Sequence, residues 1–383
     1  MVIGHCRTKF LPITEVFIEN QIFESENIKP IILTRKLDEK YLNATMSHGI
    51  IHGAKIFSFH DNSFSRFFKK MSKREGDYFS NVILRERVKL LHIHFGTDAW
   101  YFLNLKKITK MPIIVSFYGY DAYKFPKMFF GLGKTLLRQV FKRADAIIVP
   151  SWHMKKHLMV LGCDDVKIQI IPWGVRIKII NEQLRQTTSD KSIKFITIGR
   201  MVEKKGQNYL LEAFKKVLDS GINGKLTIVG QGQLKKKLVK TIDKFGIYDK
   251  VNIIDKLSNQ KVIQALMSHN IYVQPSVVAK NGDQEGIPTA IMEAMTCSLP
   301  IIATEHSGIP EIVENNVSGI LVPERDSEKL AEAMVLLANN QELCLEFGMN
   351  GRKIVQEKYN VIKQNKKLEE LYEREINSFN SNV

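Results

Sequence analysis

The sequence contains little cysteine and no long apolar run. Four of its 383 residues are cysteines, and Cys6, Cys163, Cys297 and Cys344 are scattered and form no CxxC pair. This spacing argues against a disulfide scaffold or a zinc module and predicts free buried thiols in a reducing cytoplasm. No apolar run approaches the roughly 20 residues that a membrane-spanning helix needs, and the N-terminal MVIGHCRTKF lacks the apolar stretch of a secretory signal.

Acidic residues are outnumbered by basic ones. Lys and Arg together number 56 and Asp and Glu 40, which gives a net charge of +16. Residues 1–175 hold 27 of the basic and 15 of the acidic residues, so +12 of this charge lies in the first half. Such a field attracts anionic partners, among which composition alone leaves nucleic acid, acidic lipid and phosphorylated substrates open. The 44% hydrophobic and 25% charged content is that of a globular protein and excludes wholesale disorder.

Short apolar, β-branched runs alternate with longer amphipathic stretches along the whole chain. The predicted strands are residues 28–34, 53–59, 90–95, 112–118 and 144–150 in the first half, and 193–199, 225–230, 251–255, 271–276, 300–305 and 319–323 in the second. Such alternation is typical of parallel sheets covered by helices on both faces. Two series of it predict an α/β chain with two doubly wound, Rossmann-like domains that face each other across a cleft.

The boundary between the two domains is expected near residue 175. Residues 181–192 are polar and have the composition of a linker. We therefore expect an N-terminal domain over residues 1–175, a C-terminal domain over residues 176–360, and a charged helix over residues 361–383 that packs back on the first domain. Two domains also agree with the observation that single cores seldom grow past roughly 250–300 residues.

The most informative segment is NGDQEGIPTAIMEAMTCSLP, which follows a predicted strand. Pro288 suits the first position of a helix, where its missing N–H is no loss. The backbone N–H groups of Gly286, Ile287 and Thr289 would then point at a group that lies before the helix. Because the positive end of the helix dipole stands behind them, this geometry predicts a phosphate site.

Two carboxylates stand eight positions apart in this segment, Glu285 in the loop and Glu293 in the predicted helix. One could reach a sugar or a leaving group while the other holds a ribose diol, as acidic side chains do in nucleotide-binding folds. The alternative for each is a solvated surface carboxylate. Glu293 stands among the apolar residues of IMEAM, where a carboxylate is costly without a partner.

A second group of candidates follows the first two strands of the second half. Arg200 and Lys205 come after a predicted strand, beside Gly199, and a forked guanidinium and a compact ammonium together suit a diphosphate. A solvated basic loop is the alternative. Gly230 and Gly232 form a short Gly-x-Gly turn after the next strand, which by itself is weak evidence for a nucleotide site.

The series GRMVEKKG, LTIVGQGQL, EGIPTAIMEAM and LPIIATEHSGIPEIVENNVSGILVPERD resembles the donor-binding domain of glycosyltransferase family 4. This family comprises retaining, nucleotide-sugar-dependent enzymes with the GT-B fold. The resemblance covers most of residues 193–330, where Glu285 and Glu293 match the family's Glu-x7-Glu motif. In the first half, FLPITEVFIENQI, HIHFG and SFYGYDAY resemble the family's SETFI, HxHFG and HGFD segments. The resemblance is to bacterial exopolysaccharide enzymes of the colanic-acid type.

The resemblance implies a role for each candidate residue. It implies that Arg200 and Lys205 bind the donor diphosphate and that the distal phosphate is capped by the backbone of Gly286, Ile287, Pro288 and Thr289. It implies that Glu285 contacts the transferred sugar and that Glu293 contacts the ribose hydroxyls. Gly230 and Gly232 would line the nucleotide. The family's HGFD segment begins with His, whereas this sequence has Tyr118 there. A phenol is not cationic near neutral pH, so Tyr118 and the neighbouring Asp121 are expected only to position groups. His94 is a rival polar group, with a satisfied core histidine as its alternative.

The expected reaction needs no metal and no bound cofactor beyond the nucleotide-sugar cosubstrate. No DxD pair stands at an obvious strand end, and Asp164 and Asp165 read as a turn. Fixed cations and a helix start would stabilise the leaving diphosphate. The resemblance implies retention of configuration. Double displacement would require a carboxylate close under C1, and none is identifiable, so front-face attack with assistance from the leaving phosphate is our hypothesis. The expected acceptor is a saccharide, in this family commonly linked to a polyprenyl lipid.

Two segments of the first half mix aromatic and basic residues. Residues 63–79 and 124–143 carry Phe and Met among Lys and Arg. A basic helix with aromatics on one side suits an anionic membrane surface and predicts a cytoplasmic protein attached peripherally to the inner face of the membrane. The alternative is a helix whose aromatic side faces the core.

Three other functions remain open from the sequence. Another GT-B enzyme, such as a nucleotide-sugar epimerase or a phosphorylase, would share the fold. A nucleic-acid-binding protein would share the basic charge, but no recognition motif supports it, so we expect no nucleic-acid partner. A catalytically silent nucleotide-sugar sensor would not need both Glu285 and Glu293.

Overall fold

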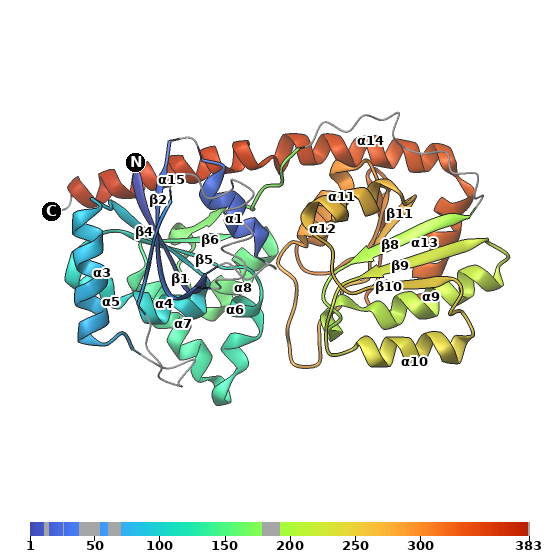
Figure 1. Cartoon of the computed structure of the whole chain (residues 1–383), viewed down its shortest axis with the longest axis horizontal. Helices are drawn as coiled ribbons and strands as arrows, with labels where there is room; N and C mark the ends of the chain where they lie inside the picture. The colour runs from blue at the N-terminus through green and yellow to red at the C-terminus, as the bar shows by residue number, and fades with distance from the viewer. Residues whose placement is uncertain (11–14, 26, 38–53, 60–69, 178–191, 382–383) are drawn as a thin grey trace. The chain divides into compact units, whose positions relative to one another are not determined.

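The computed structural model describes residues 1–10, 15–25, 27–37, 54–59, 70–177 and 192–381. The chain divides into two compact units, one of Met1–Arg176 with Asn360–Val383 and one of Ile177–Tyr359 (Figure 1). Parts of the sequence predictions lie outside the described residues. These parts are residues 181–191 of the linker predicted over residues 181–192, residues 63–69 of the first aromatic and basic segment, residues 11–14 of FLPITEVFIENQI, residue 53 of the predicted strand 53–59 and residues 382–383 of the predicted C-terminal helix.

The first unit is built on a parallel sheet of seven strands in the order β3-β2-β1-β4-β5-β6-β7. Its strands are β1 (Val2–Phe10), β2 (Lys29–Leu37), β3 (Lys55–Ser58), β4 (Leu90–His94), β5 (Ile113–Ser116), β6 (Ala146–Val149) and β7 (Ile168–Ile170). Its helices are α1 (Val16–Phe23), α3 (Lys73–Arg85), α4 (Gly96–Phe102), α5 (Asn104–Thr109), α6 (Tyr120–Tyr123), α7 (Leu132–Arg143), α8 (Trp152–Leu161) and α15 (Val361–Ser381). All five strands predicted for this half are present.

Two strands of this sheet escaped prediction, and one of them is central. β1 lies between β2 and β4, with His5 opposite His92 in the ladder. Its apolar run is interrupted by charged residues, which hid it in the sequence. Arg7 is largely buried because it forms ion pairs with Glu15 and Asp98, so tertiary partners compensate for a charge that the local pattern counts against a strand. The other omission, β7, is only three residues long.

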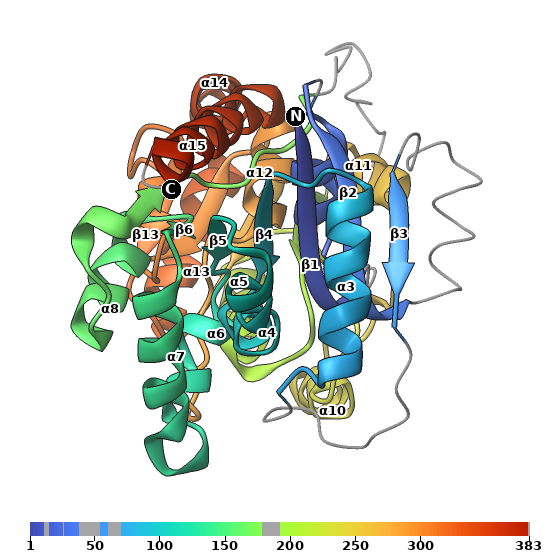
Figure 2. The ribbon, with the colours of Figure 1, turned by 90° about the vertical axis from the view of Figure 1, so that its left-hand side faces the viewer.

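Helices cover both faces of this sheet, as the runs of buried strand residues require. On one face, the sheet is covered by helices that include α3, α5 and α7 (Figure 2). Phe79, Leu105 and Leu137 of these helices lie in one core with the strands. On the other face, Leu368 and Tyr372 of α15 pack with Ile3 and residues of β4, β5 and β6. The C-terminal helix is therefore part of the core of the first unit.

The second unit is built on a parallel sheet of six strands in the order β10-β9-β8-β11-β12-β13. Its strands are β8 (Ile193–Ile198), β9 (Gly224–Val229), β10 (Val251–Ile254), β11 (Ile271–Gln274), β12 (Ile301–Thr304) and β13 (Gly319–Val322). Its helices are α9 (Gln207–Asp219), α10 (Lys235–Phe245), α11 (Asn259–Met267), α12 (Thr289–Thr296), α13 (Ser327–Asn339) and α14 (Gln341–Lys358). All six predicted strands are present.

The strand order of this sheet reverses beside β8. From β8 the chain moves outward through β9 and β10, then returns to β11 and moves outward on the other side through β12 and β13. In open α/β sheets, ligands bind beyond the carboxyl ends of the strands at such a reversal. The fold therefore directs attention to the loops that follow β8 and β11, where the sequence placed its strongest motifs.

Candidate functional site

The loops at the carboxyl edge of the second sheet bring together residues that lie far apart in the sequence. Gly199 to Lys205 follow β8, Gly230 and Gly232 follow β9, and Glu285 lies in the loop between β11 and α12. Because all strands of the sheet are parallel, these loops share one edge. The structure thus gathers the donor-site candidates of the second half in one place.

Glu285 is a buried carboxylate paired with two ammonium groups. It is 7% exposed, Lys205 Nζ lies 2.7 Å from its Oε1, and Lys204 Nζ lies 3.8 Å from its Oε2. The Ser276 hydroxyl also donates to Oε1 at 3.4 Å. Burial alone would raise the pKa of Glu285, but Lys205 and Lys204 outweigh it and lower the pKa to about 2. Glu285 is therefore an anion at neutral pH.

Lys205 reaches Glu285 by passing over a residue that has no side chain. A Cβ on Gly199 would lie 2.9 Å from Lys205 Cε and 3.1 Å from its Cδ. Burial lowers the pKa of Lys205, Glu285 opposes that effect, and the neighbouring Lys204 and Arg200 add to it. Arg200 itself is exposed at the end of β8. The site thus sets two ammonium groups against one carboxylate, with Arg200 close enough to Lys205 to affect its pKa.

The two glycines after β9 allow close packing between loops. Gly230 has a φ of +148°, and a Cβ on it would lie 2.0 Å from the carbonyl oxygen of Gly199. A Cβ on Gly232 would lie 2.3 Å from the carbonyl oxygen of Met201. The Gly-x-Gly turn is therefore needed to seat the β9 loop against the β8 loop, a packing requirement that the sequence alone did not reveal.

Helix α12 begins one residue later than predicted. Pro288 is the N-cap residue, with φ −67° and ψ 115°, and Thr289 is the first helical residue. Gly286 and Ile287 are buried in the loop before it. Glu293 is half-buried on α12.

Four residues that the sequence analysis did not select hold the loop that carries Glu285. They are Lys204, His306, Ser307 and Glu324. Lys204 Nζ donates to Asp283 Oδ1 at 3.1 Å and to the carbonyl oxygen of Gln284 at 2.9 Å. Lys204 stands beside Lys205 in GRMVEKKG, and His306 follows the predicted strand 300–305 directly, so their places at strand ends were the available signal.

The remaining candidates, His94, Tyr118 and Asp121, lie at the carboxyl edge of the first sheet. Asp121 accepts hydrogen bonds from the backbone N–H groups of Gly96, Tyr118 and Gly119 at 2.8 to 3.0 Å. It ties the loop after β5 to the start of α4. The Tyr118 hydroxyl bonds His94 Nδ1 at 2.6 Å and donates to Gln21 Oε1 at 3.1 Å, so it faces the interior.

The ring of Tyr118 belongs to an aromatic group at the same edge. Its centroid lies 4.7 Å from that of Phe95, 4.9 Å from Phe17 and 5.6 Å from Trp173. The Arg7 guanidinium stacks over Phe95 at 4.1 Å. Phe17 and Phe95 are only half-buried, so this edge offers aromatic surface.

Within the described residues, His5, His92 and His94 are the group whose ligand atoms lie close enough to hold a metal ion, within 4.8 Å of one another. Hydrogen bonds already engage five of their six ring nitrogens. His92 bonds Tyr372 at 2.5 Å and Ser116 at 2.7 Å, and His94 Nε2 bonds His5 Nδ1 at 3.1 Å. Burial lowers the pKa of all three, and that of His5 to about 3. The arrangement is a neutral hydrogen-bond network in the core.

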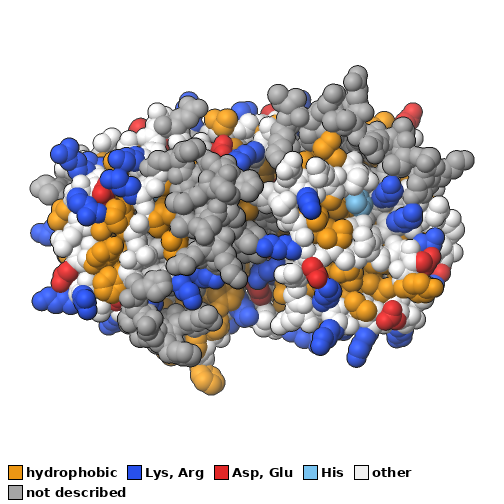
Figure 3. Space-filling view, viewed as in Figure 1, with side chains coloured by type: hydrophobic (Ala, Val, Ile, Leu, Met, Phe, Trp, Pro, Cys, Tyr) orange, Lys and Arg blue, Asp and Glu red, His pale blue; other side chains and the backbone are white. Residues whose placement is uncertain are grey.

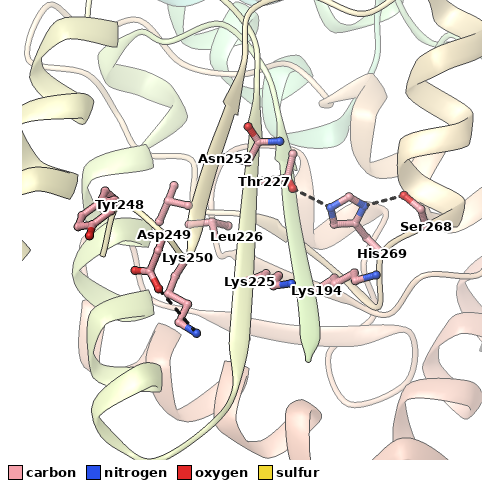
Figure 4. Close-up of a pocket in the computed structure, with 11 residues that line it drawn as sticks. Lys194, Lys225, Leu226, Thr227, Tyr248, Asp249, Lys250, Asn252, Ser268 and His269 are labelled. Atoms are coloured by element: carbon pink, nitrogen blue, oxygen red, sulfur yellow. Dashed lines mark hydrogen bonds and ion pairs between the residues drawn. The ribbon is translucent and has the colours of Figure 1, made fainter. Parts of the chain in front are cut away.

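A cavity of about 470 Å³ lies at the opposite edge of the second sheet. It is lined by Lys194, Lys225, Lys250 and His269, near the amino ends of β8, β9 and β10 (Figure 4). His269 lies on its wall, with Nε2 2.8 Å from the Thr227 hydroxyl. None of the site residues predicted from the sequence lines this cavity.

Comparison with known proteins points to one family. The amylovoran biosynthesis glycosyltransferase AmsK of Erwinia amylovora is 31% identical over 231 residues, 60% of this chain and 56% of that protein. WcaL of Escherichia coli, assigned to colanic acid biosynthesis, is 32% identical over 197 residues, 51% of this chain and 48% of that protein. The chain thus spans about half the length of these curated relatives.

The fold is also found in solved structures. Anabaena HepE in complex with UDP-glucose has a TM-score of 0.78 at 15% identity, over 98% of this chain and 100% of that one. This likeness confirms the predicted GT-B fold. Two family models, Glycosyltransferase Family 4 and Glycosyl transferases group 1, match residues 24–178 and residues 180–354. The chain therefore belongs to family 4 of the glycosyltransferases.

Proposed function

We propose that this protein transfers a hexosyl group from a nucleotide-diphosphate sugar to a saccharide acceptor, with retention of configuration. The observation that carries the proposal is the buried pair of Lys205 and Glu285 at the point where the strand order reverses. A buried carboxylate with a pKa near 2, flanked by cations, suits a reaction that develops charges of both signs.

Each residue of the site has a place in this reaction. Cleavage of the bond between C1 and the phosphate oxygen leaves negative charge on the diphosphate, and we assign its stabilisation to Arg200, Lys205 and the backbone before α12. Positive charge grows on the sugar, and we assign its stabilisation to the anionic Glu285. We assign the ribose hydroxyls to Glu293. These cations supply the stabilisation of a leaving group, and we propose that the step needs no metal.

The relatives support a proposal for the classes of donor and acceptor. HepE was solved with UDP-glucose, and AmsK and WcaL are assigned to exopolysaccharide synthesis. We propose a nucleotide-diphosphate hexose as the donor and a growing surface saccharide on a polyprenyl carrier as the acceptor. We place the acceptor on the first unit, where the aromatic group around Tyr118 offers faces on which sugar rings stack.

The variant Glu285→Ala tests the role of the carboxylate. We expect turnover to fall at least about 100-fold, as for loss of one electrostatic group, while UDP affinity changes less than threefold. Glu332→Ala is a matched control, because Glu332 is exposed and pairs only on the surface of α13. A panel of nucleotide sugars in a thermal-shift assay first identifies the donor. If Glu285→Ala turned over at the wild-type rate, the proposed role of the Glu285 carboxylate would be refuted.

The assay also separates transfer from the other functions. A transferase releases nucleoside diphosphate at a rate that depends on the acceptor, whereas an epimerase converts the donor without releasing it. Nuclear magnetic resonance of the product shows whether the anomeric configuration is retained. Release that is independent of every saccharide acceptor, or an inverted product, contradicts the proposal.

We also propose that the protein works at an anionic membrane surface. In the described part of the chain, no helix has both the length and the hydropathy to cross a membrane. Between Asp121 and Asp145 the sequence carries six basic and no acidic residues. The apolar side of α7, including Leu137 and Phe141, is buried in the core, so the helix itself has no apolar side to offer.

The apolar surface of this segment is the tip formed by the residues just before α7 and by its first residue. Phe130 is completely exposed and Leu132 is 56% exposed. Figure 3 shows a hydrophobic projection at the lower edge of this face of the molecule. Phe129 and Phe130 have φ values of +55° and +54°, which are strained for residues with a side chain. The strained backbone keeps an aromatic ring exposed to water beside cations such as Lys127. A ring in this position can insert between anionic lipid headgroups.

Flotation with vesicles tests this surface. We expect wild-type protein to float with vesicles that contain phosphatidylglycerol and to stay behind with neutral phosphatidylcholine vesicles. Phe130→Ser with Leu132→Ser should abolish flotation, while Leu84→Ser, a change at an exposed residue of α3, should not. Equal flotation with both kinds of vesicle, or flotation of the tip variant, contradicts the assignment.

A further inference from the structure

We propose that His306, held by Glu324, is a positioning residue that sets the backbone at Glu285. The inference rests on the proposed function, in which Glu285 contacts the transferred sugar. His306 lies in the loop after β12 and Glu324 in the loop after β13, so neither residue is near Glu285 in the sequence.

The hydrogen bonds of His306 define its tautomer. The backbone N–H of Glu285 lies 3.1 Å from His306 Nε2, and a backbone amide can only donate. Nε2 must therefore be unprotonated. The proton of the neutral ring lies on Nδ1, which donates to Glu324 Oε1 at 2.6 Å. His306 is fully buried, so water does not compete for either nitrogen.

Glu324 connects His306 to the other end of the same loop. Its Oε2 accepts a hydrogen bond from the backbone N–H of Val278 at 2.9 Å, and Arg325 lies 3.3 Å away. Burial would raise the pKa of Glu324, but the hydrogen bonds from His306 and Val278 lower it, so the carboxylate is ionised. One carboxylate thus fixes the beginning of the loop and orients the imidazole that fixes its end.

The two peptide units that flank the Cα of Glu285 are each held by a side chain. His306 accepts from the N–H of Glu285, and the Ser307 hydroxyl donates to the carbonyl oxygen of Glu285 at 2.7 Å. Ser307 has a φ of +50°, a strained value that the loop keeps. With both flanking peptide planes held, the direction of the Cα–Cβ bond of Glu285 is set toward the side on which its carboxylate meets Lys205. Groups that act on a substrate must be held within about 0.5 Å of the productive geometry.

Two amide substitutions at this position separate the two hydrogen bonds. The amide of glutamine reaches the place of Nε2, so His306→Gln can still accept from Glu285. The shorter asparagine reaches the place of Nδ1, so His306→Asn can still donate to Glu324 but leaves the Glu285 N–H without its acceptor. The two variants are matched in polarity and differ in which contact they keep.

We expect kcat of His306→Asn to fall about 10- to 100-fold, since a displacement near 1 Å can cost about 100-fold. His306→Gln should keep kcat within about threefold. KM for the donor and Kd for UDP should stay within about threefold in both, because the contact acts on the sugar side of the site. A merely structural histidine would instead lower the melting temperature of both variants together, without this split.

The tautomer of His306 can be measured on the wild-type protein, so this test depends neither on an activity assay nor on whether a variant folds. Long-range ¹H–¹⁵N correlation of histidine-labelled wild-type protein, with His306 connected to its own backbone, should show Nδ1 protonated and Nε2 bare. Protonation on Nε2, or equal kcat values for the Gln and Asn variants, overturns the proposal. If Glu285→Ala retains full turnover, the proposed function fails separately, because the tautomer still reports on the contact.

Discussion

The pair of Lys205 and Glu285 makes a quantitative prediction about stability. With an effective dielectric constant of about 20, the attraction is about 6 kcal/mol at the 2.7 Å of Lys205 and about 4 kcal/mol at the 3.8 Å of Lys204. Lys205→Met leaves Glu285 with its weaker partner. We therefore expect a loss of about 3 kcal/mol, at the low end of the 3–5 kcal/mol for breaking a buried pair. For a unit of this size that corresponds to a fall in Tm of roughly 6–12 °C.

A double-mutant cycle isolates the interaction. Lys205→Met leaves Glu285 with only its weaker partner Lys204, and Glu285→Gln leaves Lys205 without its carboxylate, whereas the double variant removes both charges of the pair. We expect the double variant to be more stable than the sum of the single losses by at least about 2 kcal/mol. The exposed pair of Lys215 and Asp219 on α9 is the control, and its coupling should lie below about 1 kcal/mol.

Unfolding in urea can be followed separately in the two units, because all three tryptophans lie in the first unit. Trp100, Trp152 and Trp173 report unfolding of that unit, while far-UV circular dichroism reports both. In urea, the variants should move the circular dichroism transition and leave the tryptophan transition in place if the units unfold independently. A coupling energy for the buried pair equal to that of the exposed pair would refute the reasoning.

Three further predictions follow from the same geometry. The pKa of Glu285 is lowered from 4.5 to about 2, so the contribution of its ionised carboxylate to folding stability is present above pH 4.5 and is lost as the pH falls toward 2. The urea midpoints of wild type and Glu285→Gln should therefore converge over that range. Gly230→Ala places a Cβ 2.0 Å from a backbone carbonyl oxygen, so it should weaken nucleotide-sugar binding in calorimetry. Gly221→Ala, at a φ of +88° with nothing within 4 Å, should not. Tyr372→Phe leaves a buried nitrogen of His92 without its 2.5 Å partner and should cost about 1–3 kcal/mol, seen as an earlier tryptophan transition. An unchanged tryptophan transition would contradict that assignment.

Most of the fold was predictable because its cause is local. A strand buried on both faces needs an apolar, β-branched run, and eleven of the thirteen strands in the part of the chain that the structure describes show one in the sequence. β1 was missed because its second half carries Arg7 and Lys9. The charge of Arg7 is compensated by Asp98, which is ninety-one positions away, and no window of sequence contains both residues.

The candidate site divides in the same way. Arg200, Lys205, Glu285 and the glycines could be selected because each stands at the end of a predicted strand beside a recognisable motif. That Lys205 meets Glu285 could not be read from the sequence, because the two are eighty positions apart and meet only when β8 pairs with β11. His306 and Glu324 carry no local signal of their contact with Glu285. Hydrophobic pattern and motif spacing depend on neighbours along the chain, whereas ion pairs and tautomers depend on which strands lie side by side.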